Sequence, residues 1–122
     1  MFSDSRVFAT VAVSDITKGK EFYGTKLGLQ QVDENPGGVT YESGGGRLFI
    51  YQSPTAGSGQ ATCAAWEVSN ISEVVQELVA KGITFEHYDF PGGTRDGDIH
   101  IMGPMKAAWF KDPDGNILSV AG

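Results

Sequence analysis

The sequence of 122 residues is poor in the features that mark a secreted, membrane or nucleic-acid-binding protein. Its single cysteine, Cys63, cannot form an internal disulfide, which favours a reducing cytoplasm. No apolar run approaches the ~20 residues that cross a bilayer, and residues 1–6 lack the start of a secretion signal. The net charge is −6, and the nine Lys and Arg residues are scattered. We therefore expect a cytoplasmic protein that binds neither nucleic acid nor an anionic membrane.

What the sequence does contain is an internal repeat. Val-Ser-Asp-Ile at 13–16 returns as Val-Ser-Asn-Ile at 68–71, an offset of 55. Each copy ends a strand-like segment and opens a helix, for which Asp15 and Asn70 are suitable N-caps. Both predicted helices stop at a glycine, Gly28 or Gly82, which can adopt the left-handed conformation that ends a helix. In the second helix an apolar face is predicted, formed by Ile71, Val74, Val75, Leu78 and Val79.

Strand-like runs separated by turn residues surround each helix. They cover 7–13, 29–33, 39–43 and 47–52 in the first half, and 62–68, 83–90, 105–110 and 116–121 in the second. Matching 47–50 to 117–120 gives an offset of 70, so the second copy carries about 15 additional residues. We assign these to a glycine-rich loop at 91–104.

The pattern predicts an α+β fold made of two tandem βαβββ modules. Module one covers 1–52, a flexible linker covers 53–60, and module two covers 61–122. Two half-barrel sheets related by a pseudo-twofold axis, each with its helix on the outer face, would form an open half-barrel around one shared cavity. A small molecule would bind in that cavity.

Strand alternation divides the predicted strands into two faces. The face toward the cavity is aromatic, small and mildly polar, and consists of Phe8, Thr10, Ala12, Phe49, Tyr51, Cys63, Ala65, Glu67 and Ser119. The face toward the helices is apolar and bulky, and consists of Val7, Val11, Val13, Leu48, Ile50, Trp66, Val68, Leu118 and Val120. The cavity face suits the stacking of a planar or apolar ligand.

Several motifs resemble a known family. They are Val-Ser-Asp at 13–15, Phe-Tyr at 22–23, Leu-Gly at 27–28 and Ala-Trp-Phe-Lys-Asp-Pro-Asp-Gly-Asn at 108–116. Together they resemble the vicinal oxygen chelate superfamily of glyoxalase I, bleomycin- and fosfomycin-resistance proteins and extradiol dioxygenases, above all its functionally unassigned bacterial members. The resemblance covers essentially the whole chain, and it implies a twofold dimer.

In metal-using members of that superfamily, four inward positions carry His or Glu. The resemblance places these positions at Phe8, Phe49, Cys63 and Ser119. Two phenylalanines cannot coordinate a divalent metal, and a cysteine with a serine falls short of three or four ligands. We therefore expect neither a metal nor another cofactor at the usual site.

Other residues are candidates for chemistry. Glu67 is the only carboxylate predicted on the cavity face, so it is the candidate general base, which requires partial burial to raise its pKa. Cys63 has no basic neighbour in sequence to activate it as a nucleophile, and we interpret it instead as a small residue that fills a strand. The two histidines, His87 and His100, lie among acidic residues and could form a replacement metal or acid–base site, although their spacing matches no ligand motif.

Three hypotheses remain open. The first is a metal-independent binding protein for an aromatic or amphipathic molecule, with Phe8, Thr10, Phe49, Tyr51, Cys63 and Ser119 as ligand-binding residues. The second is a metal-free isomerase, lyase or tailoring enzyme that uses Glu67 or a histidine. The third is a glyoxalase- or dioxygenase-like metalloenzyme whose ligands have moved to His87 or His100.

Overall fold

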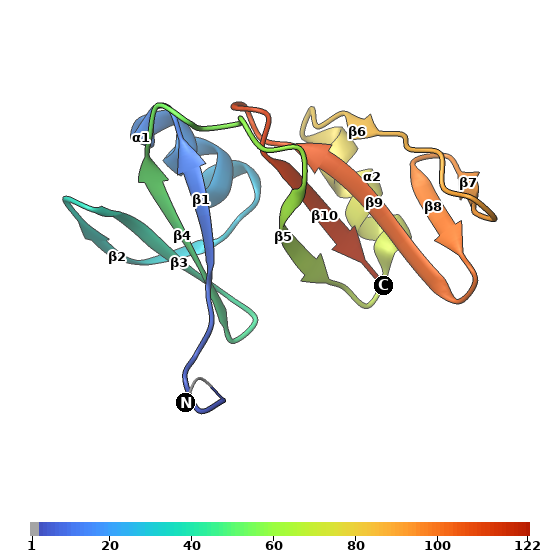
Figure 1. The fold of residues 1–122 in the computed structure, drawn as a ribbon, viewed down its shortest axis with the longest axis horizontal. Coiled ribbons are helices and arrows are strands. Elements are labelled where there is room, and N and C mark those ends of the chain that lie inside the picture. The colour runs from blue at the N-terminus through green and yellow to red at the C-terminus, as the bar shows by residue number, and fades with distance from the viewer. Residues whose placement is uncertain (1–2) are drawn as a thin grey trace. The chain divides into compact units, whose positions relative to one another are not determined.

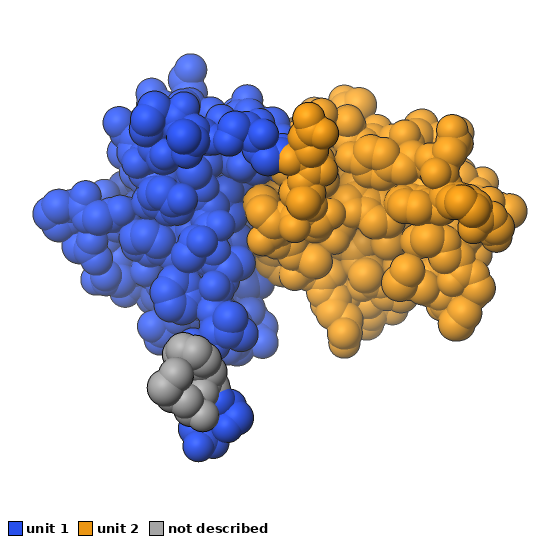
Figure 2. All heavy atoms as spheres, viewed as in Figure 1, with its two compact units in different colours: residues 1–59, 113–116 blue, residues 60–112, 117–122 orange. Residues whose placement is uncertain are grey.

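The structure is a computed structural model that describes residues 3–122 (Figure 1). By its internal contacts the chain forms two compact units (Figure 2). Unit 1 comprises residues 1–59 and 113–116, and unit 2 comprises residues 60–112 and 117–122. Strands and helices are mixed in both units, so the predicted α+β class is confirmed. The division into modules at 53–60 stays a prediction, and the short segment 113–116 groups with unit 1 although its flanking strands lie in unit 2.

Unit 1 contains one four-stranded sheet and one helical segment (Figure 1). The strands are β1 (Ala9–Val13), β2 (Gln30–Asn35), β3 (Gly38–Ser43) and β4 (Gly46–Gln52), in the order β1-β4-β3-β2. β1 runs parallel to β4, and the other pairs are antiparallel. The helical segment is α1 (Ile16–Lys20), which continues as the π-helical turn η1 (Glu21–Lys26).

The helix packs on one face of this sheet. Val11, Val13, Leu48 and Ile50 are buried, whereas the residues between them are not, as strand alternation predicts. Gly19 allows α1 to approach the sheet closely, because a Cβ at this position would lie only 3.1 Å from the Ile50 side chain and 3.2 Å from that of Val13. The glycine that makes this helix irregular in sequence is therefore what lets it touch the sheet.

Both helices begin at the predicted caps. The Asp15 carboxylate accepts hydrogen bonds from the amides of Thr17 (2.9 Å) and Lys18 (3.2 Å). The Asn70 side-chain oxygen accepts one from the Glu73 amide (3.3 Å) at the start of α2 (Ile71–Ala80). These bonds satisfy amides that have no partner within the helix.

Unit 2 repeats the arrangement with extra strands. Its strands are β5 (Thr62–Glu67), β6 (Phe85–Glu86), β7 (Thr94–Asp96), β8 (Ile99–Met102), β9 (Met105–Lys111) and β10 (Ile117–Ala121). The order is β5-β10-β9-β8-β7, with β6 paired to β9. β5 is parallel to β10, just as β1 is parallel to β4.

The register of the two parallel pairs confirms the internal repeat. Thr10 lies opposite Phe49 in unit 1, and Ala65 lies opposite Ser119 in unit 2. Thr10 and Ala65 are related by the offset of 55, and Phe49 and Ser119 by the offset of 70. The two offsets read from the sequence therefore match equivalent strand pairs.

The predicted loop at 91–104 is wrong in part, because it contains the β7–β8 hairpin (Figure 1). Ile99 and Ile101 supply the β-branched residues, and Gly97 forms the turn with a φ of +61°. The predicted strand at 83–90 shortens to the two residues of β6. The insertion is therefore a structured extension of the sheet of unit 2.

Two smaller expectations are also wrong. Val7 is 88% exposed and precedes β1, so it does not face the helix. Val79 is 48% exposed, because it lies at the margin of the apolar face of α2, whereas Ile71, Val75 and Leu78 are buried. Residues 53–60 contain turns, with backbone bonds from Ala56 to Ser53 and from Ser58 to Thr55. None of the helices in the described residues 3–122 is long and apolar enough to cross a bilayer.

Candidate functional site

The face of the unit 1 sheet opposite the helix carries the aromatic residues predicted for the ligand. Phe49 and Tyr51 project from β4 on the side opposite Ile50, and their rings stack with centroids 6.2 Å apart and 13° between planes. Thr10 of β1 and Thr40 of β3 lie opposite Phe49 on either side. We call this surface the open face of unit 1.

A pocket of about 280 Å³ opens on this face. It is lined by Phe8, Thr40, Arg47 and Phe49. The structure thus brings together two of the predicted ligand-binding residues, Phe8 and Phe49, and adds a hydroxyl and a guanidinium group. Apolar rings beside a single positive charge can hold an aromatic or amphipathic molecule and orient its polar end.

Thr10 and Tyr51 also lie in unit 1, whereas the predicted site residues Cys63, Glu67 and Ser119 lie in unit 2. Ser119 is buried on β10 between Ala65 of β5 and Trp109 of β9. Glu67 at the end of β5 is exposed, whereas the role of general base requires partial burial. That role stays a prediction.

Cys63 is accessible but is held in its thiol form. Partial burial raises the pKa of the Cys63 thiol, and the negative charge of Asp112 raises that pKa further. The sulfur makes its hydrogen bond with the Ile117 carbonyl oxygen at 3.5 Å. These surroundings disfavour the thiolate that a nucleophilic cysteine needs.

The donor set does not fit the divalent metal used by other members of the resembled superfamily. Phe8 and Phe49 have no donor atom, which leaves Cys63 and Ser119 of the four equivalent positions. Across residues 3–122 the structure forms no cluster of three or more His, Cys, Asp or Glu side chains that could hold a metal ion. We derive no chemistry through such an ion.

His87 and His100 lie near each other in unit 2, with ring centroids 6.4 Å apart. His87 Nε2 lies 2.7 Å from the Asp98 carboxylate. His100 is buried among aromatic rings: its centroid is 5.0 Å from that of Trp109, 5.7 Å from Phe90 and 6.1 Å from Tyr88. The histidines therefore belong to an aromatic cluster, and no third ligand joins them within the described chain.

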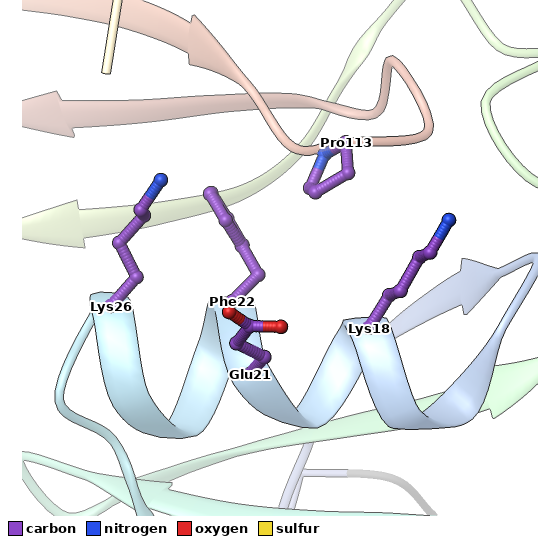
Figure 3. Close-up of a pocket in the computed structure, with 5 residues that line it drawn as sticks. All are labelled: Lys18, Glu21, Phe22, Lys26 and Pro113. Atoms are coloured by element: carbon purple, nitrogen blue, oxygen red, sulfur yellow. The ribbon is translucent and has the colours of Figure 1, made fainter. Parts of the chain in front are cut away.

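A further pocket of about 250 Å³ lies along the helical segment of unit 1. In Figure 3, Lys18, Phe22 and Lys26 extend from one side of that segment toward the turn that carries Pro113. Their spacing of four residues places them on one helix face. Glu21 also lines this pocket and offsets the charge of the lysines, so the pocket lacks a clear ligand preference.

Two groups of site residues escaped the sequence prediction. Arg47 lies two residues before Phe49 on β4, so strand alternation alone could have found it. The second group is the aromatic cluster of Tyr88, Phe90, His100 and Trp109. It forms because the segment after β6 packs against β8 and β9, and no local sequence pattern predicts that contact. Trp109 of this cluster is half-buried.

Comparisons with known proteins agree with this architecture. The sequence model of the Glyoxalase/Bleomycin resistance protein/Dioxygenase superfamily matches residues 6–120. No curated protein matches the sequence significantly.

Solved structures share the fold over nearly the whole chain. A glyoxalase family protein from Enterococcus faecalis is 24% identical, with 100% of both chains covered and a TM-score of 0.73. An antibiotic binding protein from Streptomyces sp. CB03234 is 22% identical, with 98% of this chain and 96% of that chain covered and a TM-score of 0.72. A lactoylglutathione lyase from Agrobacterium tumefaciens is 18% identical, with 98% and 94% covered and a TM-score of 0.69. At these identities the likeness shows the fold, which carries both binding proteins and enzymes.

Proposed function

The chain belongs to the Glyoxalase/Bleomycin resistance protein/Dioxygenase superfamily, and from this premise we propose that it binds a small aromatic or amphipathic molecule without a metal ion. The observation that carries the proposal is the pocket on the open face of unit 1, where Phe8 and Phe49 meet Arg47 and Thr40. A family member of similar fold is an antibiotic binding protein, which is a precedent for binding.

The composition of the pocket defines the ligand class. The rings of Phe8 and Phe49 offer apolar surface, and Tyr51 extends this surface by stacking on Phe49. Arg47 forms no ion pair with the acidic side chains of residues 3–122, so its charge is available to a ligand. An aromatic ring system with an anionic or strongly polar end fits this combination.

The proposal is tested with anilinonaphthalene sulfonate, an amphipathic aromatic anion, followed by fluorescence titration. Phe49→Ala is expected to weaken binding by about 5–30-fold, equivalent to about 1–2 kcal/mol for a lost aromatic wall. Arg47→Ala is expected to weaken it by about 2–5-fold, with the effect disappearing at high salt because the charge is exposed. Met105→Ala removes an exposed apolar side chain from unit 2 and serves as the control.

Unchanged affinity in Phe49→Ala would show that the pocket is not the binding site. Metal independence is tested separately, by the divalent-metal content of untagged protein grown in metal-supplemented medium, which is expected to be far below one equivalent. A stoichiometric metal would overturn that part of the proposal. The dimer implied by the family and the cytoplasmic location favoured by Cys63 stay predictions, and sedimentation would test the former.

A further inference from the structure

Unit 2 contains a small pocket of its own, about 160 Å³ in volume, that shares no residue with the pocket of unit 1. It is bounded by the segment after β6, which supplies Tyr88 and Phe90, and by the β7–β8 hairpin, which supplies Arg95 and His100. Its volume is well below the ~300–1,000 Å³ of pockets for drug-sized molecules. The pocket therefore suits a single ring or a similarly small planar group.

His100 supplies the unusual feature of this pocket. The side chain is only 2% exposed, and its Nε2 accepts a hydrogen bond from the Tyr88 backbone amide at 2.9 Å. Because Nε2 is an acceptor, the neutral ring carries its proton on Nδ1. Nδ1 is buried and has no hydrogen-bond partner in the described chain. A buried donor left unpaired is costly, and native proteins rarely keep one without a purpose.

The rings around His100 restrict what can reach it. Tyr88, Phe90 and Trp109 all lie with centroids within 6.1 Å of the imidazole, and the Tyr88 ring is tilted by only 31° to it. These rings make the surroundings of the Nδ1 proton apolar, where a hydrogen bond to an acceptor oxygen is stronger than in water. A planar ligand would also find rings to pack against.

Arg95 adds a positive charge to the same pocket. It lies directly opposite His100 in the β7–β8 hairpin, so the two side chains project from the same face of the sheet. Both line the pocket, and Arg95 forms no ion pair with the acidic side chains of residues 3–122. A guanidinium group and an imidazole N–H are together suited to the two oxygens of a carboxylate. Asp89, which also lines the pocket, opposes an anion and limits its affinity.

We propose that unit 2 carries a second ligand site, in which Arg95 and the Nδ1 proton of His100 bind the carboxylate of a small planar acid whose ring packs against Tyr88 and Phe90. The site is independent of the aromatic pocket of unit 1. Benzoate is the probe that contains only these elements, one ring and one carboxylate.

The test is an NMR titration of the ¹⁵N-labelled protein with benzoate. Benzoate is expected to shift the Tyr88 and Arg95 amides and the His100 Nδ1 resonance at millimolar concentrations. Arg95→Gln is expected to weaken binding at this site about 3–10-fold, whereas Arg6→Gln, the matched change at an exposed arginine of unit 1 that lines neither pocket, leaves it unchanged. Asp89→Asn is expected to tighten binding, because it removes the opposing charge. Benzamide, which has the same shape without the charge, is expected to bind less tightly.

The roles of the two ring nitrogens of His100 can be distinguished by substitution. His100→Gln keeps an acceptor near the Tyr88 amide but removes the Nδ1 donor, so it is expected to lose benzoate binding about tenfold. If that variant does not fold, the shift of the His100 Nδ1 resonance of the wild-type protein during the benzoate titration tests the proposal instead. The proposal is overturned if this resonance does not move on saturation, if benzamide binds this site as well as benzoate, or if residues around Arg47 and Phe49 shift while the Tyr88 and Arg95 amides do not. A failure here leaves the unit 1 pocket untouched, since that pocket is tested with a different probe and different variants.

Discussion

Among single residues, Gly38 at the start of β3 is the most tightly enclosed next to the candidate site. It is buried, and a Cβ at this position would collide with the Ile50 carbonyl oxygen and lie 2.6 Å from the Phe49 ring. A backbone oxygen in a sheet cannot move aside as the end of a flexible side chain can. The glycine therefore sets the position of the aromatic ring that lines the pocket.

We expect Gly38→Ala to lower the free energy of unfolding by about 1–3 kcal/mol, as measured by urea denaturation, because the added methyl overpacks this point. Gly46→Ala is the control, since a Cβ there would lie 3.4 Å from the Ser43 carbonyl oxygen, an ordinary van der Waals contact. Equal stability of Gly38→Ala and wild type would contradict the close approach between β3 and β4.

Cys63 provides a second test at this scale, and this one concerns pH. Partial burial and the Asp112 charge raise the pKa of its thiol, so the thiolate is scarce at neutral pH. Alkylation by iodoacetamide at pH 7, followed by mass spectrometry, is expected to be slower than for a free cysteine and to accelerate at alkaline pH. A rate at pH 7 equal to or above that of free cysteine would contradict this environment and reopen the nucleophile hypothesis.

For whole elements, the helix caps are where sequence and structure agree most closely. The Asp15 carboxylate accepts from two amides of the first turn of α1. Asp15→Ala is expected to cost about 1 kcal/mol of stability, whereas Asp15→Asn, which keeps the acceptor, is expected to cost little. Thermal denaturation of the two variants checks this, and equal losses would mean that charge rather than capping matters.

The strands show why part of the structure is predictable. The repeat and the alternation of apolar residues identify β1, β4, β5 and β10 and their two faces, because the direction of each side chain follows the local period of two, whereas their parallel pairing is known from the structure. The same period assigns Phe49 and Tyr51 to one face. Arg47 follows the same alternation, and charge alone does not exclude a residue from a ligand site.

The parts that sequence reasoning missed depend on contacts between distant segments. The β7–β8 hairpin is short, turns at Asp96-Gly97-Asp98 and is flanked by Gly92, Gly93 and Gly103, so the composition of the whole segment resembles a loop. The aromatic cluster joins His100 of β8 to Trp109 of β9 and to the irregular segment at 88–90. Only the tertiary fold creates that neighbourhood, and it is also where the buried donor of His100 arises.

In the whole molecule, each of the two units is built from two separate segments of the chain. Residues 113–116 connect strands of unit 2 but make their contacts within unit 1. The Asp114 carboxylate accepts hydrogen bonds from the backbone amide and hydroxyl of Ser14, and the Asn116 side-chain amide donates to the Ala12 carbonyl oxygen at 2.7 Å. The end of β1 is thus held by residues about 100 positions later in the chain.

We expect Asp114→Ala to accelerate amide hydrogen exchange in β1 and at Ser14 about fivefold, equivalent to about 1 kcal/mol, and to change exchange in β5 less. Asp98→Ala is the control, because it removes a turn aspartate whose partner, His87, lies in unit 2. Faster exchange confined to β9 and β10 in Asp114→Ala would show that the turn does not support unit 1.

The late position of this turn has a consequence for how the protein is made. A ribosome adds about 5–20 residues per second, so residue 113 is added roughly 3–10 s after residue 59. During that interval all of the first segment of unit 1 has been synthesised, but the residues that bind Ser14 and Ala12 do not yet exist. Unit 1 can complete its contacts only after residue 116 has been added, and unit 2 only after β10, which follows it, so neither unit is complete when the first half of the chain has been synthesised.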